Sequence, residues 1–175
     1  MSLDHDDTNR LLEEEHPGPD DLESALNEVP LTEIVKKDPL IVESNTSLAT
    51  VLQAMQREDR GATLVVESGK LVGIFTERDV LLKVAGQPLD LAQAEIRAFM
   101  TRDPVTLPDD STVALALNRM VVEGFRHIPL TDDEDRPVAE VSMRDLMEYL
   151  SEFFKLNLVN LPPDPRVRSG KREGA

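Results

Sequence analysis

The sequence predicts an α/β (α+β) fold made of two similar units packed as a pair. The first observation is an internal repeat, because the chain overlays on itself when shifted by 65 residues. Asp38-Pro39 then falls on Asp103-Pro104, and Met55 falls on Met120. The second observation is the pattern within each copy, which reads strand, helix, strand, strand, helix. Helices and a small sheet of this order are expected to share one aliphatic core.

The first unit begins with an extended segment that follows Pro39, because proline disfavours helix at the residue before it. Thr46 or Ser47 is expected to open a helix, since hydroxyl side chains cap helix starts. Gly69 supplies the turn between two short strands. The expected elements are Leu40-Ile41-Val42, a helix with the apolar face Leu48, Val51, Leu52 and Met55, Thr63–Val66, Leu71–Phe75 and a helix over Glu77–Val84.

The second unit repeats this order after Pro104. Ser111 or Thr112 is expected to open its first helix. An acidic turn over Asp132–Asp135 joins its last two strands. The expected elements are Val105-Thr106-Leu107, a helix with the apolar face Val113, Ala116, Leu117 and Met120, His127–Leu130, Val138–Val141 and a helix over Met143–Phe154.

Composition limits the classes of protein to which the chain can belong. Of the 175 residues 40% are hydrophobic and only 3% aromatic, so the core must be aliphatic. Cysteine is absent, which excludes disulfides, thiolate zinc sites and a cysteine nucleophile. No apolar stretch approaches the roughly 20 residues of a membrane span, and the N-terminus lacks a basic, apolar signal. We therefore expect a cytoplasmic protein.

The charge distribution separates the ends from the body. The net charge is −15, and the first 30 residues hold ten acids and one base. The body is also acidic, and it should repel nucleic-acid phosphates and anionic lipid heads. We expect no nucleic-acid partner and no membrane partner.

Both ends are expected to be flexible. Residues 1–30 form an acidic arm in which Pro17-Gly18-Pro19 breaks any helix, although Leu22, Leu26 and Val29 suit one short amphipathic turn. Two interpretations of this arm stay open: a solvated tail and a docking arm for a basic partner. The C-terminal tail at 155–175 contains a proline-rich stop, Leu161-Pro162-Pro163-Asp164-Pro165, and a weakly basic segment follows that stop. The repeats then occupy 31–90 and 91–154.

The most informative strings lie where a strand meets a helix at the end of each unit. They are Gly73-Ile74-Phe75-Thr76-Glu77-Arg78-Asp79 and Ala139-Glu140-Val141-Ser142-Met143-Arg144-Asp145. One interpretation is a capping box, in which the hydroxyl and the acid three residues later cap the helix. The other is a nucleotide site, in which the hydroxyl meets a phosphate and the carboxylate accepts from ribose hydroxyls. Glycine at position 73 would let the backbone approach a ligand closely.

Two further features are candidates for a catalytic or metal-binding site, and neither has the residues that such a site needs. His127 suits a general base or metal ligand, but only three histidines exist and no nucleophile–base–acid set accompanies it. The acidic run Asp132–Asp135 suits a hard cation, but it lacks the spaced ligands and the glycine of a calcium loop. We predict neither an enzyme nor a metal site.

Taken together, these features resemble a tandem pair of cystathionine-β-synthase (CBS) domains, often called a Bateman module. The resemblance covers about residues 31–154 and includes Phe125-Arg126-His127-Ile128-Pro129-Leu130, which is similar to a characteristic strand of the family. It implies a stand-alone, non-catalytic regulatory module whose repeats pack as a pseudo-twofold pair. Such modules bind adenosine-containing ligands in clefts between the repeats. The resemblance implies AMP, ADP or ATP as the ligand, with S-adenosylmethionine or NAD as alternatives. It implies no required cofactor, and Mg²⁺ only as a companion of ATP.

The resemblance also assigns residues by matching position. Thr76 would meet phosphate and Asp79 ribose in the first site, and Ser142 and Asp145 would do so in the second. Arg126 and His127 would lie beside a cleft and meet phosphate. The extended segments would line the adenine pockets through Ile41, Val42, Thr106 and Leu107.

Some residues depart from the family pattern. Ala139 stands where the family usually has glycine, and Glu140 would weaken anion binding. The first repeat has Gly61-Ala62 where the second has Arg126-His127. We therefore rank Asp79 slightly above Asp145. The resemblance further implies a homodimer and an unidentified protein partner, and the alternative function is an interaction or dimerisation module with vestigial ligand sites.

Overall fold

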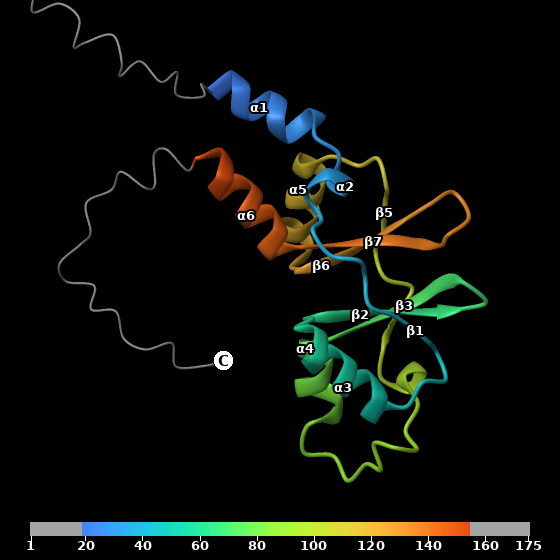
Figure 1. Ribbon diagram of the computed structural model, residues 1–175. Helices are drawn as coiled ribbons and strands as arrows, with labels where there is room; N and C mark the ends of the chain where they lie inside the picture. Colours follow the sequence, from blue (N-terminus) through green and yellow to red (C-terminus); the bar gives the residue numbers. More distant parts are fainter. Residues whose placement is uncertain (1–18, 155–175) are drawn as a thin grey trace, which may run out of the picture.

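The computed structural model describes residues 19–154, which fold into two halves that each hold a small sheet (Figure 1). In the first sheet the strand order is β1-β2-β3-β4, with β1 parallel to β2 and the later neighbours antiparallel. In the second sheet the order is β5-β6-β7, with β5 parallel to β6 and β6 antiparallel to β7. The strands are β1 (Ile41–Glu43), β2 (Ala62–Glu67), β3 (Lys70–Thr76), β4 (Thr101–Arg102), β5 (Leu107–Pro108), β6 (His127–Thr131) and β7 (Pro137–Ser142).

Helices accompany each sheet and precede the first strand. Those of the first half are α3 (Leu48–Glu58), α4 (Glu77–Asp79), η1 (Val80–Val84) and η2 (Ile96–Ala98), and those of the second are α5 (Val113–Glu123) and α6 (Met143–Phe153). Two more, α1 (Pro19–Glu28) and α2 (Leu31–Ile34), come before β1. The predicted α+β class and the predicted order of elements in each unit are confirmed.

Local sequence explains most of these boundaries. Ser47 caps α3 by accepting the Thr50 N–H at 3.3 Å. Ser68 and Gly69, at φ of 53° and 80°, make the tight turn between β2 and β3, as the glycine predicts. Thr112 stands at the cap position of α5, but its side chain makes no capping hydrogen bond.

The helix expected over Glu77–Val84 differs from the prediction. Only α4 is α-helical, and η1 continues it as a π-helix. The Ala85 N–H donates to the Val80 carbonyl at 2.8 Å, which is an i to i+5 bond. Hydrophobic spacing does not distinguish such a widened turn from an α-helix, so the sequence pattern could not show it.

The two repeats exchange the segments that enter them. Leu31 and Ile34 of α2 are buried in the core of the second half, although they precede β1. In the same way Ile96 and Met100, which precede β5, are buried in the core of the first half. The packing therefore crosses the boundary expected at residue 90. The segment that precedes the first repeat completes the core of the second half, and the segment that precedes the second repeat completes the core of the first half.

The N-terminal arm is partly built into the fold. Residues 1–18 lie outside the described residues, but α1 packs beside α5 and α6 (Figure 1). Leu26 and Val29 pack against the second core, and the Tyr149 hydroxyl donates to the Ala25 carbonyl at 3.3 Å. The expectation of a flexible segment as far as residue 30 is thus corrected for 19–30, because the amphipathic turn finds an apolar surface that the sequence alone does not reveal. None of the helices within 19–154 has the length and apolar character that crossing a membrane requires.

Candidate functional site: two clefts between the repeats

The first cleft lies where the end of β3 meets the second repeat, and it has a volume of about 560 Å³. Thr76 and Asp79 line it from the first repeat. Much of its wall is apolar, with contributions from both repeats: Ile74, Leu81, Pro104, Val105 and Phe125. A cleft of this size and polarity is suited to a small organic ligand with an apolar ring.

Thr76 and Asp79 form a reciprocal capping box at the start of α4. The Asp79 carboxylate accepts the Thr76 backbone N–H at 2.9 Å and the Thr76 hydroxyl at 2.8 Å, both through Oδ2. The Asp79 N–H in turn donates to Thr76 Oγ1 at 3.4 Å. The capping interpretation is therefore confirmed for Thr76 and Asp79.

The second oxygen of Asp79 is also occupied. Lys83 Nζ lies 2.7 Å from Oδ1, and the Thr101 hydroxyl donates to Oδ1 at 3.2 Å. Burial alone would raise the pKa of Asp79, but the hydrogen bonds from Lys83 and Thr76 outweigh it and lower the pKa below its ordinary value. Asp79 is therefore an ionised, buried carboxylate with partners on both oxygens.

The second cleft has a volume of about 420 Å³ and lies at the start of α6. Its capping box matches the first: Asp145 Oδ2 accepts the Ser142 N–H at 2.8 Å and the Ser142 hydroxyl at 2.6 Å. The Asp145 N–H donates to Ser142 Oγ at 3.2 Å. Asp145 is half-buried, and its Oδ1 has no hydrogen-bond partner among residues 19–154.

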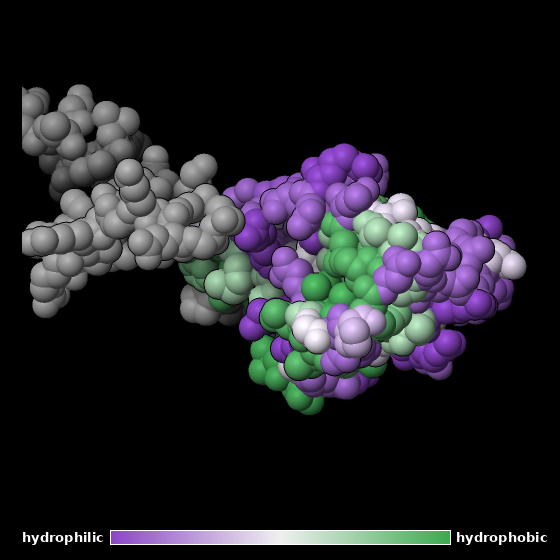
Figure 2. Space-filling view, turned by 90° about the horizontal axis from the view of Figure 1, so that it is seen from below, coloured by the Kyte–Doolittle hydropathy of each residue, from purple (hydrophilic) through white to green (hydrophobic). Residues whose placement is uncertain are grey.

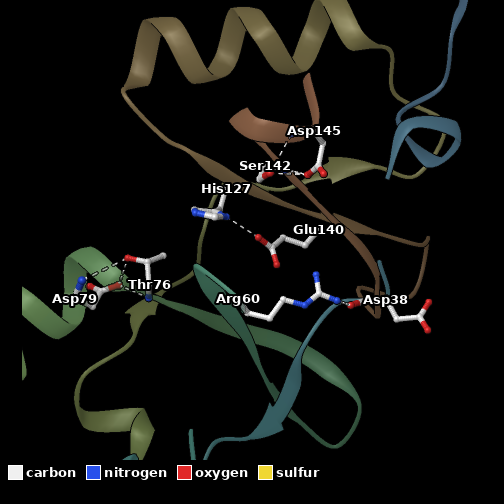
Figure 3. Close-up of polar contacts among 8 residues, drawn as sticks. All are labelled: Asp38, Arg60, Thr76, Asp79, His127, Glu140, Ser142 and Asp145. Atoms are coloured by element: carbon white, nitrogen blue, oxygen red, sulfur yellow. Dashed lines mark hydrogen bonds and ion pairs between the residues drawn. The ribbon is translucent and has the colours of Figure 1, made fainter. Parts of the chain in front are cut away.

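Charged side chains dominate the second cleft. Basic groups come from both repeats: Lys36, Lys37, Arg60, Arg126 and Arg144. Lys36 pairs with Glu148 and Glu152, and Arg60 donates to the Asp38 carbonyl (Figure 3). The side chains of Lys37, Arg126 and Arg144 make no ion pair within the part of the chain that the structure describes.

One wall is shared by the two clefts. Gly61, Glu77, Arg126 and His127 line both of them. Figure 3 shows His127 between the Thr76–Asp79 pair and the Ser142–Asp145 pair. A methyl group on Gly61 would lie 3.0 Å from the His127 ring, so the imidazole packs closely on the first repeat. Arg126 and His127, which the sequence predicts beside a cleft, line both clefts, and their contact with phosphate stays a prediction.

Glu140 holds the histidine from the side of the second cleft. His127 Nδ1 lies 2.6 Å from Glu140 Oε1, and the glutamate side chain is 7% exposed. Ile74 occupies the corresponding place in the first repeat. A carboxylate in one cleft and an aliphatic side chain in the other make the two sites chemically different.

Five residues proposed for ligand contact do not line either cleft. A Cβ added at Gly73 would lie 2.3 Å from Met100 Sδ, so the close packing of β3 against Met100 explains this glycine. Leu107 is buried in the second core and Val42 packs against the first. Ile41 and Thr106 are exposed. The chain lines the first cleft slightly earlier, through Asp103, Pro104 and Val105.

Sequence reasoning also missed several residues that line a cleft or contact its carboxylate. Lys83 stands four residues after Asp79, a spacing that places an ion pair on one helix face and gives a usable signal. Thr101 and Lys36 give no such signal, because they reach the clefts only through the exchange of segments between repeats.

The acidic turn at Asp132–Asp135 is satisfied internally. Asp132 accepts the backbone N–H groups of Glu134 and Arg136, each at 2.9 Å, and also pairs with the Arg136 guanidinium. These hydrogen bonds from Arg136 hold the pKa of Asp132 below its ordinary value. Among residues 19–154 there is no group of three or more side chains arranged to hold a metal ion.

Comparison with known proteins identifies this arrangement. The CBS domain model matches residues 31–86 and again residues 95–152. An uncharacterised 17.7 kDa protein of Acidianus ambivalens is 29% identical over 127 residues, which cover 72% of this chain and 76% of that protein. The meiotically up-regulated gene 70 protein of Schizosaccharomyces pombe is 30% identical over 116 residues, 66% of this chain but only 16% of the longer protein.

Solved structures share the fold. The CBS domain pair of protein MJ0100, in complex with 5-methylthioadenosine and S-adenosyl-L-methionine, is 25% identical with a TM-score of 0.62, covering 70% of this chain and 99% of that one. CBS domain protein PAE2072 from Pyrobaculum aerophilum, complexed with AMP, is 22% identical with a TM-score of 0.62, covering 71% and 99%. With both repeats matched and the fold shared, the chain belongs to the CBS domain family as a tandem CBS pair.

Proposed function

We propose that this chain is a non-catalytic regulatory module that binds an adenosine-containing ligand between its CBS repeats and signals to a partner or oligomer. The observation that carries the proposal is the matched hydroxyl–carboxylate pair at each cleft, Thr76 with Asp79 and Ser142 with Asp145. The MJ0100 pair, solved with two adenosine derivatives, supports the ligand class.

The chemistry of the clefts suits such a ligand. A carboxylate that accepts from both ribose hydroxyls fixes a nucleoside with two charge-assisted hydrogen bonds. The apolar wall of the first cleft offers surface for a purine ring. Arg126, which lines both clefts, offers a guanidinium to a phosphate. We therefore favour AMP, ADP or ATP, with Mg²⁺ accompanying ATP, over S-adenosylmethionine or NAD.

We further propose that the module acts as a homodimer. Four large apolar side chains, Leu81 and Leu82 on η1 and Val121 and Val122 on α5, are each 73% exposed. Figure 2, which views the molecule from the end that carries the first repeat, shows hydrophobic surface gathered beside hydrophilic surface. Exposed apolar surface of this kind is typical of an association site.

A thermal-melting panel tests the ligand proposal. AMP, ADP, ATP, NAD and S-adenosylmethionine are each added with and without Mg²⁺. A ligand at 100 times its dissociation constant stabilises the fold by about 2.7 kcal/mol, which raises the melting temperature by roughly 5–10 °C in a chain of this size. Sedimentation equilibrium measures the oligomer in parallel.

A second candidate function, an interaction or dimerisation module with vestigial sites, has its own support. Both oxygens of Asp79 are already taken by side chains of the protein, and Glu140 places a negative charge in the second cleft. A folded dimer whose melting temperature responds to no ligand of the panel would favour this candidate and reject ligand sensing.

A further inference from the structure

The carboxylate of the first cleft has no free acceptor position. An ionised carboxylate offers about four lone-pair sites. In Asp79, Oδ2 accepts the N–H and hydroxyl of Thr76, and Oδ1 accepts Lys83 Nζ at 2.7 Å and the Thr101 hydroxyl at 3.2 Å. A ligand that needs this carboxylate must first displace one of those partners.

Lys83 is firmly held in its position. Its ammonium group has three N–H donors. Three acceptors surround it: Asp79 Oδ1, the Phe99 carbonyl at 2.8 Å and Thr101 Oγ1 at 3.4 Å. The Asp79 side chain is only 10% exposed and the Lys83 side chain 37%, so the carboxylate end of this ion pair is largely shielded from water. A ribose hydroxyl is a weaker donor than an ammonium group, and it does not readily replace Lys83.

The second cleft lacks both of these competitors. Tyr149 occupies the position that corresponds to Lys83, and its hydroxyl donates to the Ala25 carbonyl of α1. Lys36 corresponds to Thr101, and its ammonium group pairs with Glu148 and Glu152. Asp145 Oδ1 therefore keeps its lone pairs available within the described part of the chain.

We propose that the second cleft alone binds the ribose of the ligand, through Asp145 Oδ1, and that Lys83 keeps ribose out of the first cleft by occupying an acceptor site on Asp79 Oδ1. The inference rests on the proposed function and reverses the ranking that the sequence motifs suggest. Asp79 lies in the intact motif, but groups of the protein occupy both of its carboxylate oxygens. Asp145 lies in the motif that departs from the family pattern, and its Oδ1 remains free to accept a hydrogen bond from a ribose hydroxyl.

Calorimetric titration with AMP and with 2′-deoxyadenosine monophosphate tests this assignment. The wild type should bind one equivalent of AMP, and loss of the 2′-hydroxyl should weaken binding about tenfold, since the hydrogen bond is to a charged acceptor. Asp145→Asn should weaken AMP binding about tenfold, and it should abolish the difference in affinity between the two nucleotides.

Lys83 supplies the decisive variants. Lys83→Met should bind a second equivalent of AMP, whereas Lys83→Arg, which keeps a cation beside Asp79, should bind one as the wild type does. The double variant Lys83→Met, Asp145→Asn should bind one equivalent of AMP at the first cleft and a second about tenfold more weakly. Retained binding at the first cleft also shows that Asp145→Asn leaves the protein folded.

The outcomes separate the two proposals. Two equivalents in the wild type, or one equivalent that discriminates the 2′-hydroxyl after Asp145→Asn, would overturn the assignment of clefts and leave the proposed function intact. If neither the wild type nor Lys83→Met binds either nucleotide, the proposed function fails and this inference fails with it.

Discussion

Gly73→Ala tests whether this glycine serves packing rather than ligand access. The new Cβ would lie 2.3 Å from Met100 Sδ and 2.9 Å from its Cγ. Both residues are buried in the first half, where β3 pairs with β4 at Gly73 and Arg102. The methionine side chain must move, and the core around it is already filled.

Two opposing effects set the change in the free energy of unfolding that Gly73→Ala causes. Adding a methyl group to a packed core costs about 1–3 kcal/mol. Gly73 does not have a positive φ, so alanine fits its backbone and stabilises by about 0.4–1 kcal/mol through the unfolded chain. The expected net loss is about 1–2 kcal/mol, or roughly 2–8 °C in melting temperature.

The second repeat indicates which change should restore the stability. It has Ala139 where the first has Gly73, and Val35 where the first has Met100. Val35 packs against the core that contains Ala139, so the smaller partner accommodates the larger strand residue. Urea unfolding of Gly73→Ala, Met100→Val and the double variant should show a favourable coupling of about 1 kcal/mol. Strictly additive losses would refute the reasoning.

Two further predictions concern the ion pair and the exchanged segments. Because hydrogen bonds from Lys83 and Thr76 lower the pKa of Asp79, its stabilisation is present above the unfolded pKa of about 3.9 and is lost as the pH falls through the folded value. Urea unfolding should therefore show that Asp79→Asn is less stable than the wild type at pH 6. The difference in the free energy of unfolding between the two proteins should narrow below pH 4. A difference that stays constant with pH would contradict this reasoning. Leu31→Ala should cost about 2–5 kcal/mol and lower amide-exchange protection first in α5 and α6, whereas Ile96→Ala should do so first in β2 and β3. Loss of protection in the opposite halves would show that the exchange is wrongly described.

Much of the fold was predictable because each repeat encodes its own elements. The expected strands Thr63–Val66 and Val138–Val141 each lie within an observed strand, and the helix expected from Met143 begins there. The capping residues Thr76 and Ser142 were equally readable, since a hydroxyl with an acid three residues later acts locally.

What was not predictable depends on contacts between distant segments. The docking of α1 needs an apolar surface made by α5 and α6, and β4 exists only because residues near 100 return to the first sheet. The clefts share this limitation, because Thr101 meets Asp79 across 22 residues. A local sequence pattern does not predict which oxygen of a carboxylate remains free to accept a hydrogen bond.

The two repeats keep the same order of elements, and several of their sequence differences lie at the clefts. Ile74 corresponds to Glu140, Lys83 to Tyr149, and Gly61 to Arg126, and in each pair at least one member lines a cleft or contacts its carboxylate. Exchanges inside the cores, such as Leu48 for Val113, preserve apolar character because packing demands it. The cleft residues are under no such packing constraint, so a duplicated fold holds two unlike sites. The wall that the sites share includes His127, which pairs with Glu140 of the second cleft.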